Sequence, residues 1–555
     1  MSLPLQDRAQ NGDETIVRMT LADLGQPFES GQIVTTLNPK LIPDRPLADG
    51  EQYRFHFNVT KCIGCRSCEI ACNEQNGNPA DILWRRIGEI EGGVYPDTHR
   101  HYLSMGCNHC LDAECVKGCP VDAYTKDPVT GIVLHSADAC IGCQYCVWNC
   151  PYSVPQFNAA RGVVGKCDMC HGRLTDGLEP ACVNACPEAA IEIEIVDKTA
   201  WRIDYAAAES PGMPAAGLTI STTRITLPPN PSARLERVDS GRIHPEHAHP
   251  SLVFMTTLTQ AATGSLIFLL LQNAAQPLQL TLLFFVTLIA LSISVFHLGR
   301  PAYAWRALKM WRRSWLSREV LFFGLFFATL TAFTITSWIA KLPPALTAVL
   351  PLSGLNSTWL QDLQTFPFTP NLLLALGWTA ALFGIAGTIA SAFIYLVPAR
   401  PAWNLIHTPI DFLLSAGFIG ATLPLTLNWI ARHLAHFRLL RSMSSPTATG
   451  TSTYWPVLFF AALWTVNQVV RLVRLNTSGL FEERATAELL NTQDLRPAVI
   501  CSFGLAAASA VLAFCGAFAY AMLAAFAAVL LVRYLFFVSV VPLNMALTFT
   551  RGGSH

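Results

Sequence analysis

The chain has 555 residues, with 38 Lys and Arg against 38 Asp and Glu, so its formal net charge is zero at pH 7. A balanced charge offers no basic surface to a polyanion, and we expect no nucleic-acid partner. The length allows more than one domain, and the two parts of the chain differ in composition. Residues 1–249 are polar and hold 16 of the 18 cysteines, whereas residues 250–550 consist mainly of long apolar runs.

The polar part begins with a stretch, residues 1–50, in which Pro and Gly are scattered without periodicity. We expect an irregular N-terminal arm there, either disordered or wrapped around a partner subunit. The alternating patterns of YRFHFNV (53–59) and AIEIEIV (190–196) each predict a strand. They enclose the cysteines and define a domain over 51–197. The stretch 198–249, rich in Pro, Ser and Ala, indicates a linker.

Four cysteine quartets fill this domain. They are Cys62, Cys65, Cys68 and Cys72; Cys107, Cys110, Cys115 and Cys119; Cys140, Cys143, Cys146 and Cys150; and Cys167, Cys170, Cys182 and Cys186. The first and third have the C-x2-C-x2-C-x3-C spacing of bacterial two-cluster ferredoxins, in which three thiolates bind one cluster and the fourth binds its neighbour. We therefore predict an α+β double ferredoxin-like domain with four [4Fe–4S] clusters, which would act together as an electron-transfer chain.

By analogy with that crossed scheme, we expect the outer two quartets to share two clusters and the inner two quartets to share the other two. The expected ligand sets are Cys62, Cys65, Cys68 and Cys186; Cys72, Cys167, Cys170 and Cys182; Cys107, Cys110, Cys115 and Cys150; and Cys119, Cys140, Cys143 and Cys146. Zinc sites are an alternative, but zinc ribbons rarely continue C-x2-C into x2-C-x3-C-P. Disulfides are another, but they need export, and the N-terminal residues contain no pattern of a leader sequence.

The apolar part contains segments long enough to span a bilayer. We predict an all-α bundle of about eight transmembrane helices over residues 250–548. The expected spans are 251–273, 278–298, 318–340, 371–397, 408–430, 454–475, 497–517 and 520–545. The last two lie in one apolar stretch that is too long for a single span, and we divide it around Gly516–Tyr520.

Ionisable side chains within or beside the spans are candidates for function. His297 ends the second span, and Arg318 and Glu319 open the third. Because a quinol releases two protons and two electrons on oxidation, a histidine and a carboxylate near the membrane interface suit a quinol site. The alternatives are that His297 caps a helix end and that Arg318 and Glu319 form an exposed ion pair. Arg533 lies inside the eighth span, where we expect a structural partner such as Asp411.

Charge also bears on the membrane side. Eight spans place both ends of the bundle on one side, and the loop 300–318 on that side is rich in Arg and Lys. The positive-inside rule then predicts a multi-pass protein of the cytoplasmic (inner) membrane, with the cluster domain on the cytoplasmic side. Histidines of the apolar part are few and lie mostly near span ends, so we predict no haem.

The four quartets resemble those of the iron–sulfur subunit of dimethyl sulfoxide reductase-type molybdoenzymes over about residues 53–195. The segments KCIGCRSCEIAC, CNHCLDAECVKGCP and CIGCQYCVWNCPYSVPQF carry this resemblance. The apolar part resembles the membrane anchor subunit of the same enzymes, through FHLGRPAYAWRAL, SWLSREV and RYLFFVSVVPLNMALTF. The chain thus resembles a fusion of two subunits, which would fix their ratio at one to one.

This resemblance implies that the anchor oxidises menaquinol from the quinone pool, with His297 and Glu319 at positions of the family's quinol site. It also implies a separate molybdopterin-containing catalytic subunit that receives the electrons and reduces an S-oxide or N-oxide acceptor in anaerobic respiration. The chain itself would be the quinol-oxidising electron-transfer subunit. Three alternatives remain open. The first is reverse flow, from a partner that oxidises formate or a sulfur compound to quinone. The second is a redox-driven ion pump, and the third is a passive anchor with no quinone site.

Overall fold

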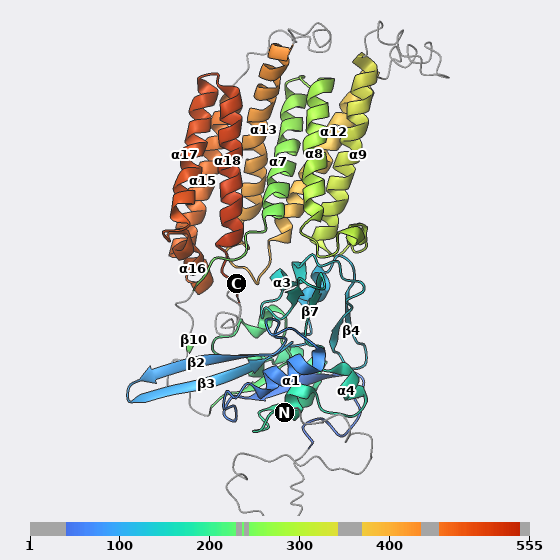
Figure 1. Ribbon diagram of the computed structural model, residues 1–555, viewed down its shortest axis with the longest axis vertical. Helices are drawn as coiled ribbons and strands as arrows, with labels where there is room; N and C mark the ends of the chain where they lie inside the picture. The colour runs from blue at the N-terminus through green and yellow to red at the C-terminus, as the bar shows by residue number, and fades with distance from the viewer. Residues whose placement is uncertain (1–39, 229–235, 238–242, 342–368, 435–453, 544–555) are drawn as a thin grey trace, which may run out of the picture.

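The computed structural model describes residues 40–228, 236–237, 243–341, 369–434 and 454–543. An α+β domain that contains the four cysteine quartets lies at one end, and a bundle of long helices extends from it (Figure 1). This arrangement confirms the predicted fold class. Most of the expected N-terminal arm, residues 1–39, lies outside the described residues.

The α+β domain consists of short strands and helices. In chain order these are β1 (Glu51–Asn58), α1 (Ser67–Asn76), β2 (Arg86–Val94), β3 (Asp97–Met105), α2 (Glu114–Gly118), β4 (Tyr124–Lys126), β5 (Val133–His135), α3 (Tyr145–Asn149), β6 (Gln156–Asn158), β7 (Val163–Gly165), α4 (His171–Thr175), α5 (Ala181–Asn184) and β8 (Ile191–Asp197). The two strands that alternation predicted are β1 and β8, which pair antiparallel. Their apolar residues, including Phe55, Phe57, Ile191 and Ile193, are buried, as a half-buried sheet requires.

Three hairpins complete this domain. β4 pairs with β5 and β6 pairs with β7, each over three residues. The long hairpin of β2 and β3 reaches away from the domain (Figure 1), and β10 (Glu236–Arg237) adds a short third strand beside β2.

Part of the stretch expected to be a linker, 198–249, is instead folded onto the α+β domain. It forms α6 (Lys198–Ile203) and β9 (Arg224–Thr226), and β9 runs parallel to β1 to complete a sheet of order β8-β1-β9. Trp201 is buried, and its indole Nε1 donates a hydrogen bond of 2.8 Å to the carbonyl of Ser221. A strand of three residues is too short to give a periodic signal, which is why composition alone indicated a linker.

Eight helices of the described residues are long and apolar enough to cross a membrane, in agreement with the eight predicted spans. They are α7 (Pro250–Leu271), α8 (Pro277–Val295), α9 (Trp315–Lys341), α12 (Thr369–Ile394), α13 (His407–Leu434), α15 (Trp455–Thr477), α17 (Arg496–Phe514) and α18 (Phe518–Val538). Gly516, with φ of +78°, makes the turn between the last two, as expected from the sequence.

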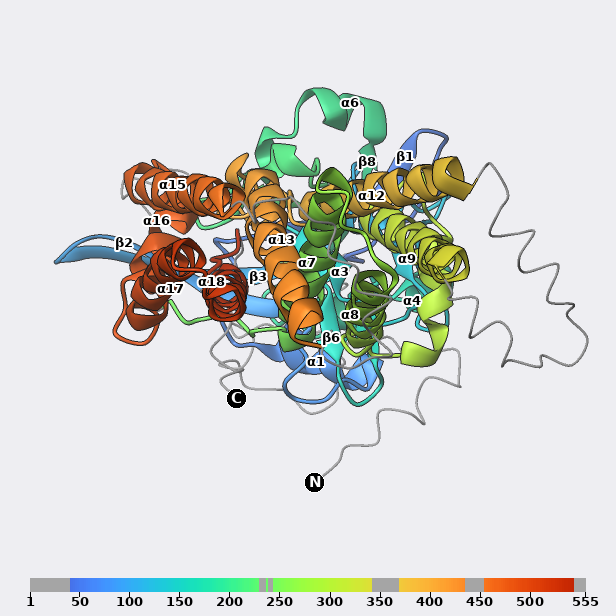
Figure 2. The same ribbon diagram turned by 90° about the horizontal axis from the view of Figure 1, so that it is seen from above.

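The bundle has two halves that meet at α7 and α13 (Figure 2). One half contains α7, α8, α9 and α12, and the other contains α13, α15, α17 and α18. A β-carbon on Gly264 of α7 would lie 1.8 Å from the carbonyl oxygen of Ala416 of α13, so only glycine permits this close approach. The short helices η4 (Pro301–Leu308) and α16 (Phe481–Leu490) follow α8 and α15 at the end that faces the α+β domain.

Candidate metal centres and the membrane junction

The backbone around the cysteines turns through the left-handed region at repeated places. Gly64 and Arg66 in the first quartet have φ of +69° and +62°, and Gly142 and Gln144 in the third have +69° and +60°. Such turns direct successive N–H groups into one concavity, which favours anions and iron–sulfur clusters. Main-chain N–H groups also donate to thiol sulfurs. These bonds join Gly142 to Cys140 (3.4 Å), Met169 to Cys167 (3.4 Å), Ala123 to Cys119 (3.3 Å) and Ala190 to Cys186 (3.2 Å).

The thiols gather in four groups. Cys62, Cys65, Cys68 and Cys186 line one cavity, and Cys107, Cys110, Cys115 and Cys150 line another. The remaining thiols are neighbours by their electrostatic interactions: Cys72 with Cys167, Cys182 and Cys170, and Cys146 with Cys143, Cys119 and Cys140. We number the groups in the order of the ligand sets expected above. The first group contains Cys62, the second contains Cys72, the third contains Cys107 and the fourth contains Cys146.

Burial controls the chemistry of these thiols. Burial, with a smaller contribution from neighbouring thiols, raises the pKa of Cys62 to about 11 and the pKa of Cys143 to about 12. A thiol with such a pKa remains protonated at neutral pH and is a poor nucleophile. A coordinated iron ion deprotonates its thiol outright. Sets of largely buried thiols with nearby N–H donors therefore fit iron–sulfur clusters.

The four groups follow one another from the helical bundle to the far end of the α+β domain. Contacts between neighbouring groups establish this order: Tyr124 interacts with both Cys115 and Cys146, Cys167 with Cys107, and Cys68 with Cys182. The fourth group is next to the bundle, because residues on either side of its cysteines bind the loop after α8. The first group is at the opposite end, where Cys65 and Ile63 are exposed.

The loop between α8 and α9 is fixed against the segments around Cys119 and Cys140. Main-chain N–H groups of the loop donate to carbonyls of the domain, from Gly299 to Gly142 (3.3 Å), Arg300 to Ile141 (3.1 Å) and Met310 to Pro120 (3.2 Å). Side chains add to this contact, from Arg300 to the carbonyl of Ala137 (2.8 Å) and from Ser314 to the carbonyl of Gly118 (2.7 Å). The sequence motif that contains His297 therefore also docks the membrane part onto the fourth group.

Three glycines allow the closest approach at this junction. A β-carbon on Gly299 would lie 2.2 Å from the carbonyl oxygen of Gly162, and one on Gly142 would lie 2.8 Å from the Cα of Gly299. Both distances are below any ordinary contact between heavy atoms. The main chains of the two parts consequently touch directly, with no side chain between them.

The three sequence-predicted quinol residues lie at this junction, at the adjoining ends of α8 and α9. His297 follows α8 and is half-buried; burial lowers its pKa to about 4, although a hydrogen bond with the backbone at Ser294 opposes this shift. Glu319 lies in α9 and is 7% exposed, with its Oε1 buried and the side chain of Ser391 as a hydrogen-bonding neighbour. Arg318 points elsewhere: its guanidinium donates to the carbonyls of Trp311 (3.1 Å) and Arg312 (2.7 Å). The described residues therefore do not pair Arg318 with Glu319, and Glu319 is buried rather than exposed.

Aromatic residues that the sequence did not identify join the fourth group to the bundle. Trp148, between Cys146 and Cys150 in α3, packs edge-on against Trp403 and His249, with ring centroids 5.5 and 5.4 Å apart. Tyr145 also lies in α3, and the carboxylate of Glu319 in α9 is close enough for its charge to act on the phenol of Tyr145. His249, which packs on Trp148, also interacts with His297. His297 is therefore connected to α3 through His249, and Glu319 is connected to α3 through Tyr145. The sequence signal that could have identified Trp148 is its position inside a cysteine motif, between Cys146 and Cys150.

Arg533 forms the expected ion pair with Asp411, which confirms that prediction. Nη2 of Arg533 lies 3.1 Å from a carboxylate oxygen of Asp411, and the two side chains are 1% and 3% exposed. Gln260 accepts a second bond from Arg533 at 3.2 Å, and Gln468 donates to Asp411. The pair joins α13 to α18 inside the second half of the bundle, where it has a structural role.

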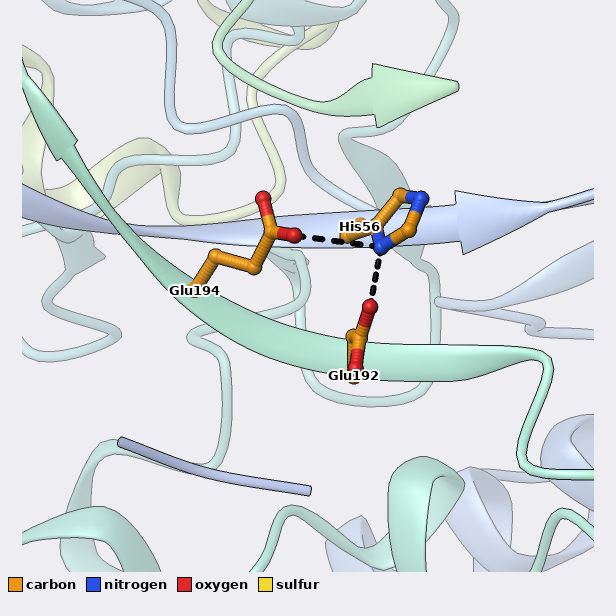
Figure 3. A group of neighbouring side chains, drawn as sticks. All are labelled: His56, Glu192 and Glu194. Atoms are coloured by element: carbon orange, nitrogen blue, oxygen red, sulfur yellow. Dashed lines mark hydrogen bonds and ion pairs between the residues drawn. The ribbon is translucent and has the colours of Figure 1, made fainter. Parts of the chain in front are cut away.

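A separate polar cluster lies on the β8-β1-β9 sheet, where His56, Glu192 and Glu194 point toward one another (Figure 3). Their possible ligand atoms lie within 4.8 Å, a spacing that a metal ion could use. Arg54 and Arg224 already pair with Glu194, however, and Arg224 belongs to β9. We therefore interpret the cluster as an ion network that ties β9 to β8.

Together these features define a class of protein, the iron–sulfur electron-transfer proteins that carry their own multi-pass membrane anchor. A family model described as "4Fe-4S dicluster domain" matches residues 98–195, and one described as "DMSO reductase anchor subunit (DmsC)" matches residues 244–360. The chain belongs to the dimethyl sulfoxide reductase family, as an iron–sulfur subunit fused to a membrane anchor subunit.

Similar curated proteins cover the α+β domain. One subunit of the anaerobic dimethyl sulfoxide reductase of Haemophilus influenzae is 36% identical over 200 residues, which are 34% of this chain and 96% of the relative. Its counterpart in Escherichia coli (strain K12) is 36% identical over 191 residues, 33% of this chain and 91% of the relative. One subunit of the sulfite dehydrogenase of Allochromatium vinosum is 35% identical over 160 residues, 25% of this chain and 67% of the relative. The likeness thus extends to proteins named for different substrates.

Proposed function

We propose that this chain oxidises menaquinol at the membrane junction and passes the electrons through four [4Fe–4S] clusters to a molybdopterin-containing catalytic subunit. That subunit would reduce an S-oxide or N-oxide acceptor in anaerobic respiration. The observation that carries the proposal is the line of four thiol groups. It begins beside two acid–base groups, the half-buried His297 and the buried Glu319, and ends at the exposed Cys65.

The four groups are the proposed ligand sets, and all sixteen thiols are cysteine. Each [4Fe–4S] cluster, when bound, accepts and donates one electron. The chain's own contribution is to hold the sets in sequence and to surround them with N–H donors, such as Gly142 and Met169. We propose no haem, because the donor sets are complete without a histidine.

The oxidised quinol must lose two protons as well as two electrons. His297 is neutral near pH 7, since burial lowers its pKa to about 4, and its imidazole can accept one proton. Glu319 has a buried carboxylate that can accept the other. Arg318, held at the membrane interface by two loop carbonyls and stacked on Trp315 at 4.2 Å, would border the path by which the quinol enters from lipid.

The catalytic partner would dock at the far end of the α+β domain. There Ile63 and Ile70 are 48% and 60% exposed beside the first group, and apolar residues of this size at a surface suit a protein interface. The proposed location is the cytoplasmic membrane, with the α+β domain on the cytoplasmic side. Reverse flow from a dehydrogenase partner to quinone is the second candidate, favoured by the likeness to a subunit of a sulfite dehydrogenase.

The experiment compares His297→Ala and Glu319→Gln with Lys341→Gln, a matched control at the far end of α9. Each full-length chain is purified in detergent with its iron, and cluster reduction is followed after adding a menaquinol analogue or dithionite. We expect the two junction variants to lose reduction by quinol but to retain reduction by dithionite, while the control behaves as wild type. Undiminished quinol oxidation in both junction variants would refute the assignment of this site.

A further inference from the structure

The α+β domain contains a buried positive charge that its protein partners do not fully satisfy. Arg85 directly precedes β2 and is only 2% exposed. Burying a charged group is costly unless hydrogen bonds or opposite charges compensate for the lost water. The Nε and Nη2 atoms of Arg85 are nevertheless buried without a hydrogen-bond partner among the described residues. The guanidinium therefore presents free N–H groups to its surroundings.

Those surroundings are the first and second thiol groups. Nη1 donates to the carbonyl and to the hydroxyl of Ser104, each at 3.2 Å, and that hydroxyl lies 3.3 Å from Sγ of Cys68 in the first group. On the other side, a β-carbon on Gly106 would lie 3.3 Å from Nη2 and 3.5 Å from Sγ of Cys167 in the second group. The absence of a side chain at Gly106 thus leaves Nη2 and the Cys167 sulfur facing the same small space.

Among the described residues, the main electrostatic partners of Arg85 are thiols and not carboxylates. The strongest electrostatic partners of Arg85 are Cys182, Cys68, Cys167 and Cys72, which belong to the first and second groups. Glu69 is also near, but its carboxylate accepts the N–H of Ile87 and pairs with Arg66. The ring of Phe55 covers one face of the guanidinium at 4.6 Å and keeps water away from it.

We propose that Arg85 is a positioning residue shared by the two clusters farthest from the membrane, and that its charge and free N–H groups raise both of their reduction potentials. The proposal rests on the ligand sets given under the proposed function. Adding an electron makes a cluster more negative, and a nearby positive charge or an N–H bond to sulfur favours that state. Arginine suits the position better than lysine, because its planar fork reaches two sides at once. Higher potentials at this end would draw electrons away from the junction.

The test uses full-length chains with counted iron and measures all cluster potentials by redox titration with electron paramagnetic resonance. Arg85→Gln removes the charge, Arg85→Lys keeps the charge without the fork, and Arg100→Gln removes an exposed charge on β3 as the control. We expect Arg85→Gln to lower the equilibrium constant for one-electron reduction at least tenfold, about 59 mV, for two of the four clusters. The other two clusters, and all four in Arg100→Gln, should keep their potentials.

Arg85→Lys decides the matter if Arg85→Gln does not assemble with iron. We expect it to lower the equilibrium constant at least threefold for one or both of the same clusters. Wild-type potentials in an iron-loaded Arg85→Gln chain, or in Arg85→Lys where only that variant assembles, would overturn the proposal. A wild-type chain with far fewer than about sixteen iron atoms would instead contradict the ligand sets, so the two failures are distinguishable.

Discussion

Replacing Gly299 by alanine is expected to separate the two parts of the chain where they are closest. The added β-carbon would lie 2.2 Å from the carbonyl oxygen of Gly162 and 2.8 Å from its Cα. Non-bonded heavy atoms ordinarily stay about 3.5 Å apart, so the junction must open by roughly 1 Å. Because Gly299 is two residues from His297, this opening displaces the proposed quinol site from the fourth group. A displacement of that size in a reacting geometry costs about 100-fold in rate.

The assay is the rate at which a menaquinol analogue reduces the clusters of the purified chain, read by visible absorbance in a stopped-flow instrument. Dithionite reduction and iron content should remain at wild-type levels, because the thiol groups are untouched. Gly324→Ala on α9 is the matched control, since a β-carbon there meets nothing within 4 Å. A Gly299→Ala chain that quinol reduces as fast as wild type would refute the role of this contact.

Further predictions concern stability and the remaining cysteines. Asp411→Ala leaves the charge of Arg533 buried without its partner and should lower the stability of the solubilised chain by about 3–5 kcal/mol, measured by thermal unfolding. The double variant Asp411→Leu with Arg533→Met should recover most of this stability. Equal losses of stability in the single and double variants would contradict the prediction. Burial raises the pKa of Glu194, but bonds from His56 and the neighbouring arginines outweigh it and lower this pKa to about 2. The contribution of Glu194 to the stability of the fold is therefore present above about pH 4.5 and is lost as the pH falls toward 2. Glu194→Gln should therefore flatten the acid-unfolding curve in that window, whereas parallel curves would exclude this contribution. Replacing the exposed Cys501 and Cys515 by serine should leave the iron content unchanged, and a loss of iron would make them ligands.

Much of the architecture followed from short-range patterns in the sequence. The spacing of the quartets restricts which thiols can face one place, and the length of an apolar run fixes whether it can span a bilayer. Gly516 could be placed between the last two spans for the same reason, since two spans need one turn. The pairing of Arg533 with Asp411 was predictable because a charge inside a span needs a partner.

Features that depend on contacts distant in the sequence were not predictable in this way. Arg85 has no local pattern, and Trp148 is marked only by its place inside a cysteine motif. The surroundings of both residues come from segments that only the fold brings together. The cations of the loop 300–318 gave a second difficulty. They were counted as an indicator of membrane side, yet Arg300 and Arg306 bind carbonyls of the α+β domain, and Arg313 pairs with Asp122. The presence of these three arginines is therefore explained by docking, on whichever face the domain lies.

The central claim is that electrons enter the four thiol groups from a quinol at the junction. The most direct measurement is to add a menaquinol analogue anaerobically to the purified, iron-loaded chain and record the electron paramagnetic resonance spectrum. The account predicts that signals of reduced clusters appear in the wild type and are absent in Glu319→Gln. Clusters that dithionite reduces but quinol never reduces in the wild-type chain would contradict it.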